Sequence, residues 1–172
     1  MLHYAYMTAK HYHVFETAYG WMGLAGSQAG ISRLILPQPS ANDVLTLLGV
    51  TKEHLDEDAF GDLPQRLQRY LDGESAEFPD KLDFHGATEF RIKVWRATQA
   101  IPSGQSKSYG WIADRIGRPN AARAVGQALG ANPIPIIIPC HRVIAGDGGL
   151  GGFGGGIQMK KTLLRIEKPN EL

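Results

Sequence analysis

The chain has 172 residues, of which 18 are Lys or Arg and 17 are Asp or Glu, so its formal net charge is +1. A hydrophobic fraction of 43% with 20% charged residues is typical of a globular protein and excludes a disordered or fibrous one. The single cysteine, Cys140, excludes an internal disulfide and any metal site that needs several thiolates from one chain. No apolar run approaches the ~18 residues that span a membrane, and the first residues lack a signal-peptide layout. We therefore expect a protein that is cytoplasmic, or nuclear in a eukaryote, and is not secreted.

The near-zero net charge hides a division between the two halves of the chain. Residues 1–87 contain 6 Lys or Arg and 12 Asp or Glu, a net charge of −6, whereas residues 88–172 contain 12 and 5, a net charge of +7. Such asymmetry indicates two units with different partners. We predict an N-terminal domain at 1–87 and a C-terminal domain at 88–172. The basic half is a candidate polyanion binder, although charge alone equally allows two solvated surfaces without a partner.

The first half contains signals for both strands and helices. Residues 12–21 and 31–36 are rich in β-branched and aromatic residues between Gly and Ser, which predicts strands of a small meander. Residues 40–48 and 63–71 have apolar side chains at helical spacing, and residues 72–79 are polar and predict a surface loop. The chain is therefore expected to have a mixed α/β fold of the α+β type.

The second half predicts three helices in succession. Residues 88–100 are amphipathic, Ser108 can cap a short helix at 109–116, and a further helix at 121–129 ends at Gly130. Two short helices joined by a few residues that include Gly are the outline of a helix-turn-helix. The same outline also occurs in proteins that do not bind DNA.

The helix predicted at 121–129 is unusual because most of its residues are small. Small side chains allow a close approach, either to another helix in the core or to the wall of a groove. Arg123 is the one long cation in this run, which favours the groove. The small residues are Ala121, Ala122, Ala124, Gly126 and Ala128.

Residues 132–144, with the sequence NPIPIIIPCHRVI, lead to the only thiol. Prolines fix the backbone and remove donors, so the three prolines predict a rigid, largely buried approach to Cys140. A lone cysteine in apolar surroundings is more often an inert core residue. However, His141 and Arg142 follow directly, and cationic or donor groups can stabilise a thiolate.

The run PCHRVI at 139–144 resembles the active-site signature of the O6-alkylguanine-DNA alkyltransferases, also called methylated-DNA–protein-cysteine methyltransferases. The resemblance covers roughly residues 88–168 in the right order and spacing, and no motif is matched in the first half. The other matching positions are Ser108-Tyr109-Gly110, residues 122–126, Asn132-Pro133, residues 151–153 and 155–156, Lys160, Leu163-Leu164 and Glu167.

The resemblance implies a fold and a function. The expected fold is a ribonuclease H-like three-stranded sheet with helices, followed by a helical, winged-helix-like domain that carries the helix-turn-helix. The expected function is DNA repair by direct, irreversible transfer of a methyl or other alkyl group from O6-alkylguanine to Cys140, and O4-alkylthymine is left open as a second substrate. The protein would flip the base and act once, with no cofactor. Its partner would be double-stranded DNA carrying alkylated guanine; we expect a monomer without a membrane partner.

The resemblance also implies catalytic roles for five residues. Cys140 would accept the alkyl group, His141 would deprotonate it through a water molecule, and Glu167 would orient His141. Tyr109 would give its phenolic proton to the departing guanine, and Asn132 would hold the turn before an active-site strand. An imidazolium next to the thiolate would lower the pKa of the thiol.

DNA-binding roles fall, by the same resemblance, on the helix of small residues. Arg123 would enter the base stack where the flipped base left. Ala122, Ala124 and Gly126 would face the minor groove, which is only ~6 Å wide. Tyr109 would contribute to DNA binding as well as to catalysis.

Substrate-pocket roles fall on Val143, Phe153, Gly154 and Lys160. The Val143 carbonyl would read the exocyclic amine of guanine, and the segment 146–156, with eight glycines in eleven residues, would close over the base. Phe153 stands where many members have Tyr and keeps a ring for stacking. Gly154 stands where Ser is common and can still supply a backbone N–H. The additional glycines predict a looser loop.

Two other functions remain open at this point. A cysteine hydrolase also pairs Cys with His, but neighbouring residues in an extended strand point in opposite directions, which makes direct contact between Cys140 and His141 awkward. A non-catalytic, alkyltransferase-like lesion binder would lack the cysteine. The histidines His3, His11 and His13 lie close together in the sequence, but a metal site would need further ligands, so no metal is expected.

Overall fold

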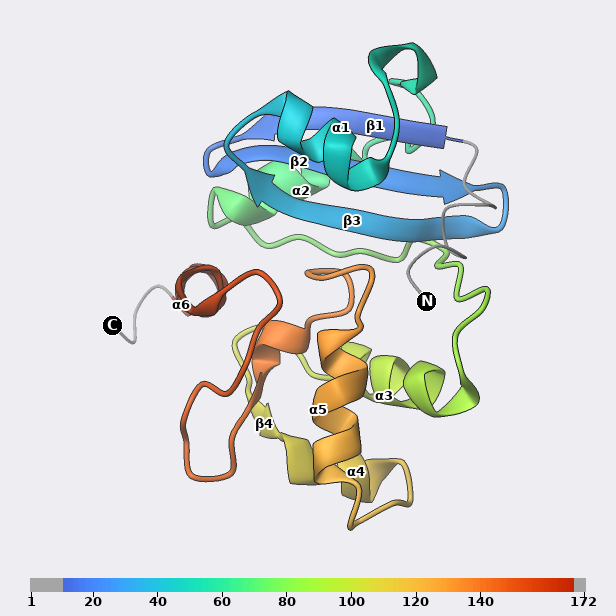
Figure 1. The fold of residues 1–172 in the computed structure, drawn as a ribbon. Coiled ribbons are helices and arrows are strands. Elements are labelled where there is room, and N and C mark those ends of the chain that lie inside the picture. Colours follow the sequence, from blue (N-terminus) through green and yellow to red (C-terminus); the bar gives the residue numbers. More distant parts are fainter. Residues whose placement is uncertain (1–10, 169–172) are drawn as a thin grey trace. The chain divides into compact units, whose positions relative to one another are not determined.

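The computed structural model describes residues 11–168, so His3 lies outside the described residues. The chain divides into two compact units, with the boundary between Gly86 and Ala87. Each unit is described by itself (Figure 1). The fold combines a small antiparallel sheet with helices, as the sequence predicts.

The sheet of the first unit is an antiparallel meander of three strands. They are β1 (His11–Thr17), β2 (Gly20–Ser27) and β3 (Gly30–Gln38), in the order β1-β2-β3. The single strand predicted at 12–21 is wrong, because a turn between Thr17 and Gly20 separates β1 from β2. Gly20 has a φ of +124°, and its carbonyl accepts a hydrogen bond from Oγ1 of Thr17 at 2.7 Å. Most of β2 was missed because its sequence, GWMGLAGS, is rich in Gly and Ala, which have low β-propensity.

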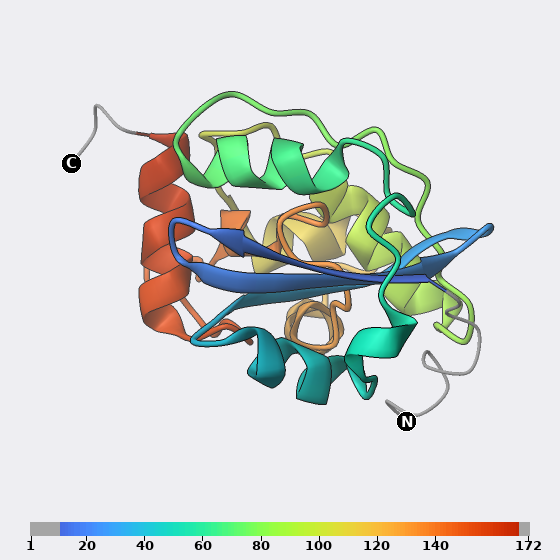
Figure 2. The ribbon, with the colours of Figure 1, turned by 90° about the horizontal axis from the view of Figure 1, so that it is seen from above.

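Helices α1 (Ala41–Leu48) and α2 (Leu63–Leu71) lie on opposite faces of this sheet (Figure 2). Gly23 of β2 lies beneath α1, where an added Cβ would come within 2.4 Å of Cγ1 of Val44, so the helix packs directly on the strand. Ser40 caps α1 by accepting a hydrogen bond from the Asp43 N–H, as its place in the sequence predicts. The core on the α1 side consists of Tyr12, Ala25, Ile35, Val44 and Leu48.

The polar segment after α2 has no helix or strand over 74–80 and folds back on that helix, as predicted for a loop. Arg66 of α2 binds Asp80 through two hydrogen bonds of 2.7 Å, and it also binds Asp62. A short 3-10 helix, η1 (Lys52–His54), joins α1 to the segment before α2.

The second unit is mainly helical. Its elements are α3 (Glu89–Gln99), β4 (Lys107–Ser108), α4 (Tyr109–Arg115), α5 (Ala122–Gly130), the 3-10 helix η2 (Cys140–Arg142), β5 (Val143–Ile144) and α6 (Ile157–Glu167). Helices α4 and α5 are joined by a turn through Gly117, which has a φ of +72°, and they form the predicted helix-turn-helix outline. Ser108 caps α4 by accepting from the Trp111 N–H. The indole N–H of Trp95 in α3 donates to the Ala128 carbonyl in α5 at 2.8 Å, which joins these two helices.

A two-stranded parallel ladder brings separate segments of the second unit together. Lys107 of β4 is opposite Val143 of β5, and Ser108 is opposite Ile144. Tyr109 follows β4 directly, and Cys140 precedes β5 by three residues. The register therefore holds the start of α4 beside the segment that carries the thiol.

Among residues 11–168, no helix combines the length and the apolar character that crossing a membrane would require.

Replacing Leu67 by Ala should lower the free energy of unfolding by about 2–5 kcal/mol, because its side chain is fully buried between α2 and the sheet. The matched control is Leu47→Ala, since the Leu47 side chain is 41% exposed. This control should change the stability by less than about 0.5 kcal/mol. Urea unfolding followed by circular dichroism measures both, and equal losses would contradict the assignment of Leu67 to the core.

Candidate active site

The chain approaches the thiol through a buried, strained loop between α5 and η2. Ile134, Ile136 and Ile138 are buried, and Ile136 has a φ of +74°, a conformation that is costly for a β-branched residue. Asn132 supports this loop, because its Oδ1 accepts from the Ile134 N–H and its Nδ2 donates to the Ile138 carbonyl, both at 2.9 Å. The structural role expected for Asn132 therefore has a geometric basis.

The same amide also reaches the thiol. Nδ2 of Asn132 donates to Sγ of Cys140 at 3.1 Å, and Cys140 is only 8% exposed. The expectation of an extended strand at Cys140 is wrong. Residues 140–142 form η2, in which the Cys140 N–H donates to the Ile138 carbonyl and the Arg142 N–H donates to the Pro139 carbonyl. The strand β5 begins only at Val143, so the alternation that made contact between Cys140 and His141 awkward does not apply.

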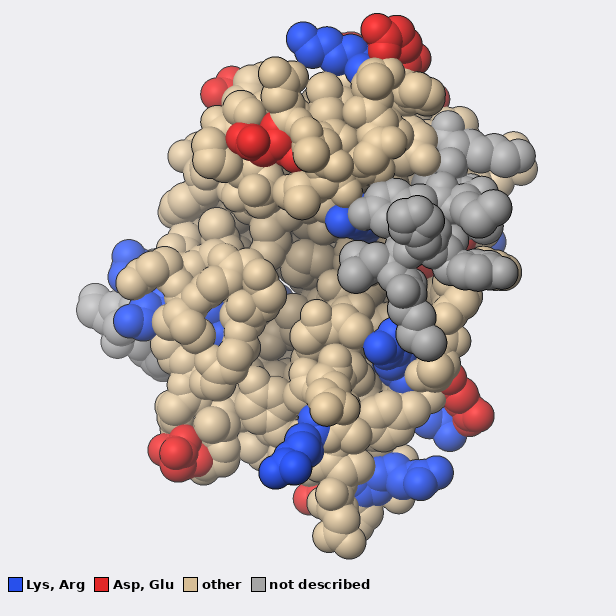
Figure 3. Space-filling model, viewed as in Figure 1, with Lys and Arg blue, Asp and Glu red and all other residues tan. Residues whose placement is uncertain are grey.

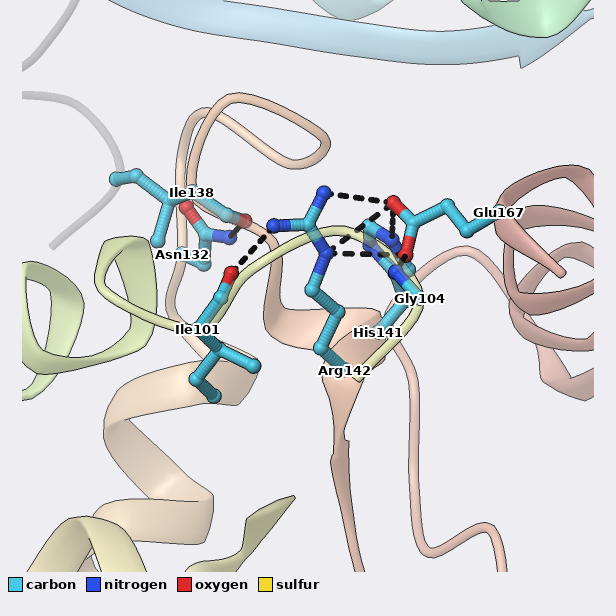
Figure 4. A network of polar contacts seen from close by, with 7 residues as sticks. All are labelled: Ile101, Gly104, Asn132, Ile138, His141, Arg142 and Glu167. Carbon is cyan, nitrogen blue, oxygen red and sulfur yellow. Dashed lines mark hydrogen bonds and ion pairs between the residues drawn. The ribbon is translucent and has the colours of Figure 1, made fainter. Parts of the chain in front are cut away.

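His141 and Glu167 form a buried pair. Nε2 of His141 lies 2.8 Å from Oε1 of Glu167, and the two side chains are 0% and 1% exposed (Figure 4). The contact with Glu167 uses Nε2 of the imidazole. Glu167 ends α6, where its spacing from Lys160 predicts a shared face. On that face, Leu163 rather than Leu164 is the fully buried leucine.

Arg142 completes this network; the sequence indicates it only as a cationic neighbour of the thiol and does not predict its contact with Glu167. Its Nε and Nη2 bind the carboxylate of Glu167 at 2.7–3.1 Å, and its Nη1 donates to the Ile101 carbonyl at 2.6 Å (Figure 4). The backbone N–H of Gly104 donates to Oε2 of Glu167 at 3.4 Å. The signal that could have identified Arg142 is its place in the PCHR run, but spacing along the chain does not show that its guanidinium reaches α6.

Burial and charge set the protonation of these groups. Burial would raise the pKa of Glu167, but its hydrogen bonds with His141 and Arg142 outweigh this and lower the pKa to about 2. Burial lowers the pKa of His141 below 6.5, against the opposing effect of Glu167. Burial also raises the pKa of the Cys140 thiol, against the lowering effects of Asn132 and Lys160. The thiol and the imidazole are therefore both neutral at rest, which corrects the expectation of a lowered thiol pKa.

Tyr109, the first residue of α4, lies close to the thiol and to the glycine-rich loop. A Cβ added at Gly151, which has a φ of +67°, would lie 2.5 Å from the Tyr109 hydroxyl, so only glycine fits there. A Cβ at Gly126 of α5 would contact the other side of the ring at 3.7 Å. Burial raises the pKa of Tyr109, and a charge on Cys140 would raise it further. The phenol therefore keeps its proton at neutral pH.

Lys160 of α6 joins the glycine-rich loop to β5. Its side chain is fully buried, and Nζ donates to the carbonyls of Val143 at 2.6 Å, of Gly152 at 3.3 Å, and of Leu150. Burial lowers the pKa of Lys160, while a charge on Cys140 raises it. By binding these carbonyls, the ammonium group of Lys160 restricts a loop that would otherwise be loose because of its glycines.

The other sequence-predicted residues lie farther out on this unit. Arg123 is exposed on α5, while Ala122, Ala124 and Phe153 are half-buried and Gly154 is exposed. The buried residues of α5 are Val125, Ala128 and Leu129, so one side of this helix belongs to the core and the other is open to a partner. Lys and Arg side chains are visible at the surface in the region where Figure 1 shows α4 and α5 (Figure 3).

Among residues 11–168, no group of three His, Cys, Asp or Glu side chains is arranged to hold a metal ion. Nδ1 of His11 lies 3.0 Å from Asp56, and the His13 ring stacks on Phe15 with 5.6 Å between ring centroids.

Comparison with known proteins identifies relatives of both units. Residues 89–169 match the family model of the 6-O-methylguanine DNA methyltransferase, DNA binding domain. A methylated-DNA–protein-cysteine methyltransferase of Mycobacterium tuberculosis is 42% identical over 160 residues, which cover 92% of each chain.

Solved structures agree with these matches. The crystal structure of Mycobacterium tuberculosis OGT in complex with DNA has a TM-score of 0.77 at 43% identity and covers 92% of this chain and 93% of that one. The O6-methylguanine-DNA methyltransferase of Pyrococcus kodakaraensis has a TM-score of 0.70 at 29% identity, with 92% and 98% of the chains covered. Since a relative is 42% identical over nearly its whole length, this chain belongs to the methylated-DNA–protein-cysteine methyltransferase family.

Proposed function

We propose that this chain repairs DNA by moving the alkyl group of O6-alkylguanine onto Sγ of its own Cys140, once per molecule. The observation that carries the proposal is the placement of the chain's only thiol, which receives a hydrogen bond from Asn132 and adjoins the buried pair of His141 and Glu167. Such a constellation can activate a nucleophile that is neutral at rest.

The reaction would be a single displacement. His141 accepts the thiol proton, an S–C bond forms, and the bond between the alkyl carbon and O6 breaks. Glu167 stabilises the imidazolium, and Tyr109 gives its proton to the guanine, which then leaves as a neutral base rather than an anion. The raised pKa of Tyr109 supports this role, because only the protonated phenol can donate.

The pocket would be formed by Val143 and by the loop that Lys160 restrains. The Val143 carbonyl has a second lone pair besides the one that Lys160 uses, and this lone pair can accept from the exocyclic amine of guanine. Phe153 would stack on the base, and Gly154 would offer its backbone N–H. The buried Lys160 makes this loop better ordered than its glycine content alone predicts.

DNA would be bound through the open side of α5. Arg123 would replace the flipped base in the stack, and the half-buried Ala122, Ala124 and Gly126 would allow the helix to approach the minor groove. The net charge of +7 on residues 88–172 supports binding to the phosphate backbone.

The finer description of the molecule is also part of the proposal. The first unit would be ribonuclease H-like and the second winged-helix-like, corresponding to domains at 1–87 and 88–172. The protein would act as a monomer, in the cytoplasm or in a nucleus, without a cofactor or metal. Its substrate would be double-stranded DNA carrying alkylated guanine.

Replacing Cys140 by Ser should abolish alkyl transfer while leaving the affinity for DNA nearly unchanged, because the serine hydroxyl is a poor nucleophile at neutral pH and the DNA-binding surface is retained. Mass spectrometry after incubation with methylated duplex DNA should show one added methyl group on each unaltered chain and none on the variant. A serine variant that still removes methyl groups would refute the acceptor role. Release of product with turnover would indicate a hydrolase, and binding without a gain in mass would indicate a lesion binder.

Replacing Arg123 by Ala should slow the repair of duplex DNA far more than the reaction with free O6-alkylguanine, because only the duplex requires a substitute for the flipped base. The matched control is Arg165→Ala, which removes an exposed arginine from α6. Single-turnover rates on the two substrates measure the difference. Equal losses on both substrates would exclude the role of Arg123 in base flipping.

Replacing Glu167 by Gln should slow transfer by ~10²–10⁴-fold, because a neutral partner no longer stabilises the imidazolium. His141→Phe should be similarly slow, and the double variant should lose little more, since the two residues act as one unit. In the unaltered protein, the rate should be steady near neutral pH and fall as the pH drops through the pKa of His141, which lies below 6.5. Single-turnover rates across pH test this, and parental rates in both single variants would exclude the relay.

A further inference from the structure

We propose that Arg142 is a positioning residue that influences where the relay proton rests, because its hold on Glu167 adds to burial in keeping His141 neutral until Cys140 releases its proton. The inference rests on the proposed function, in which Cys140 and His141 exchange that proton. It assigns a task to the side chain of η2 that contacts both α6 and the turn after α3 (Figure 4).

Glu167 binds Arg142 as well as His141, so its carboxylate is shared between the two side chains. Oε1 lies 2.8 Å from Nε2 of His141, 2.7 Å from Nη2 of Arg142 and 3.1 Å from its Nε. Oε2 receives Nε of Arg142 at 3.0 Å and the Gly104 N–H at 3.4 Å. A guanidinium that binds both oxygens is charged at every accessible pH. It therefore offsets part of the negative charge that would otherwise favour an imidazolium.

The charged groups around His141 can be assigned element by element. Glu167 of α6 favours the imidazolium, while Lys160 of α6 and Arg142 of η2 disfavour it. Cys140 of η2 contributes a charge only after it loses its proton, and Tyr109 of α4 stays protonated at neutral pH. The turn after α3 contributes backbone groups, the Ile101 carbonyl and the Gly104 N–H. The effect of one carboxylate on His141 is thus opposed by two cationic side chains, those of Arg142 and Lys160.

These charges affect protonation of His141 differently when the proton comes from solvent and when it comes from Cys140. A proton taken from solvent would add a third positive charge to a buried site, which like-charge repulsion and desolvation both oppose. A proton passed from Cys140 leaves the total charge unchanged, and the thiolate that it creates is stabilised by Lys160. Arg142 therefore opposes protonation of His141 by solvent, but it does not oppose the transfer of a proton from Cys140 to His141.

A purely structural role is the competing explanation, because Arg142 also joins the turn at Ile101 to α6. That role predicts a loss of stability but no change in the intrinsic pKa of His141. The two explanations are therefore separated by the titration of one imidazole, measured in folded protein.

The experiment is an NMR titration of histidine-labelled protein without DNA, with the signal of His141 assigned among the six histidines by His141→Phe. In the unaltered protein, the pKa of His141 should lie below 6.5. In Arg142→Gln it should rise by about one to two units, the usual effect of a charge at this range. In Arg142→Lys it should stay near the parental value, because the charge is retained. The acid limb of the single-turnover rate should move to higher pH in the glutamine variant only.

A second pair of variants covers the case in which Arg142→Gln does not fold with Glu167 left unpaired. Glu167→Gln is compared with the double variant Arg142→Gln/Glu167→Gln, in which neither buried charge remains. The pKa of His141 should again be higher, by about one to two units, in the protein that lacks the guanidinium.

Three results would overturn the proposal. The first is a resting, unaltered protein in which His141 is an imidazolium at neutral pH. The second is a pKa of His141 that does not change when the guanidinium is removed, whether Glu167 is present or replaced by Gln. The third is an Arg142→Lys variant in which His141 titrates as it does in Arg142→Gln. Because the titration uses no DNA, it is independent of the proposed function. Absence of alkyl transfer by the unaltered protein would instead refute the proposed function and leave the titration result standing.

Discussion

The buried carboxylate of Glu167 is the group on which the active site of the second unit depends. It ends α6, yet it binds His141 and Arg142 of η2 and a backbone N–H of the turn after α3. Burying an ionised carboxylate that is 1% exposed is costly unless it is hydrogen-bonded and paired with cations, so its stability depends on contacts from all three elements. The same contacts that compensate the buried charge also fix the ring of His141, the proposed base. Stability and the proposed catalysis therefore depend on the same interactions.

A second constraint fixes the position of the thiol. Asn132 donates to Cys140 and to the Ile138 carbonyl from one amide nitrogen, while its oxygen holds the Ile134 N–H. These bonds keep Ile136 in a left-handed conformation that is unfavourable for a branched side chain. Strain of this kind persists only where the surroundings determine the backbone, and here the prolines and the buried isoleucines do so. The hydrogen bond from Asn132 thereby helps to hold the sulfur in place.

Sequence reasoning located most of the elements because caps and apolar spacing are local signals. Ser40 and Ser108 each accept the expected hydrogen bond at a helix N-terminus. Properties that depend on distant contacts were not predictable. The strand β2 is buried on both faces, so its Gly- and Ala-rich sequence does not alternate, and the 3-10 turn at Cys140 depends on support from Asn132. Arg142 reaches α6 across 25 positions in the sequence. The family signature predicts which residues react, but only the fold shows which charged groups surround them.

Whether the pKa of the Cys140 thiol is raised or lowered affects how this family member avoids unwanted reactions of its thiol. A lowered pKa, as the sequence predicts, would give a thiolate that is always present and open to oxidation or to stray electrophiles. Burial instead raises the pKa of Cys140, and in the proposed reaction His141 accepts the thiol proton only as the alkyl group is transferred. A protein that is consumed by one reaction gains from a nucleophile that forms only with substrate in place. Lys160 favours the thiolate once it forms, and because the same ammonium restrains the loop over the base, the electrostatics of the thiol and the shape of the pocket are coupled through one side chain.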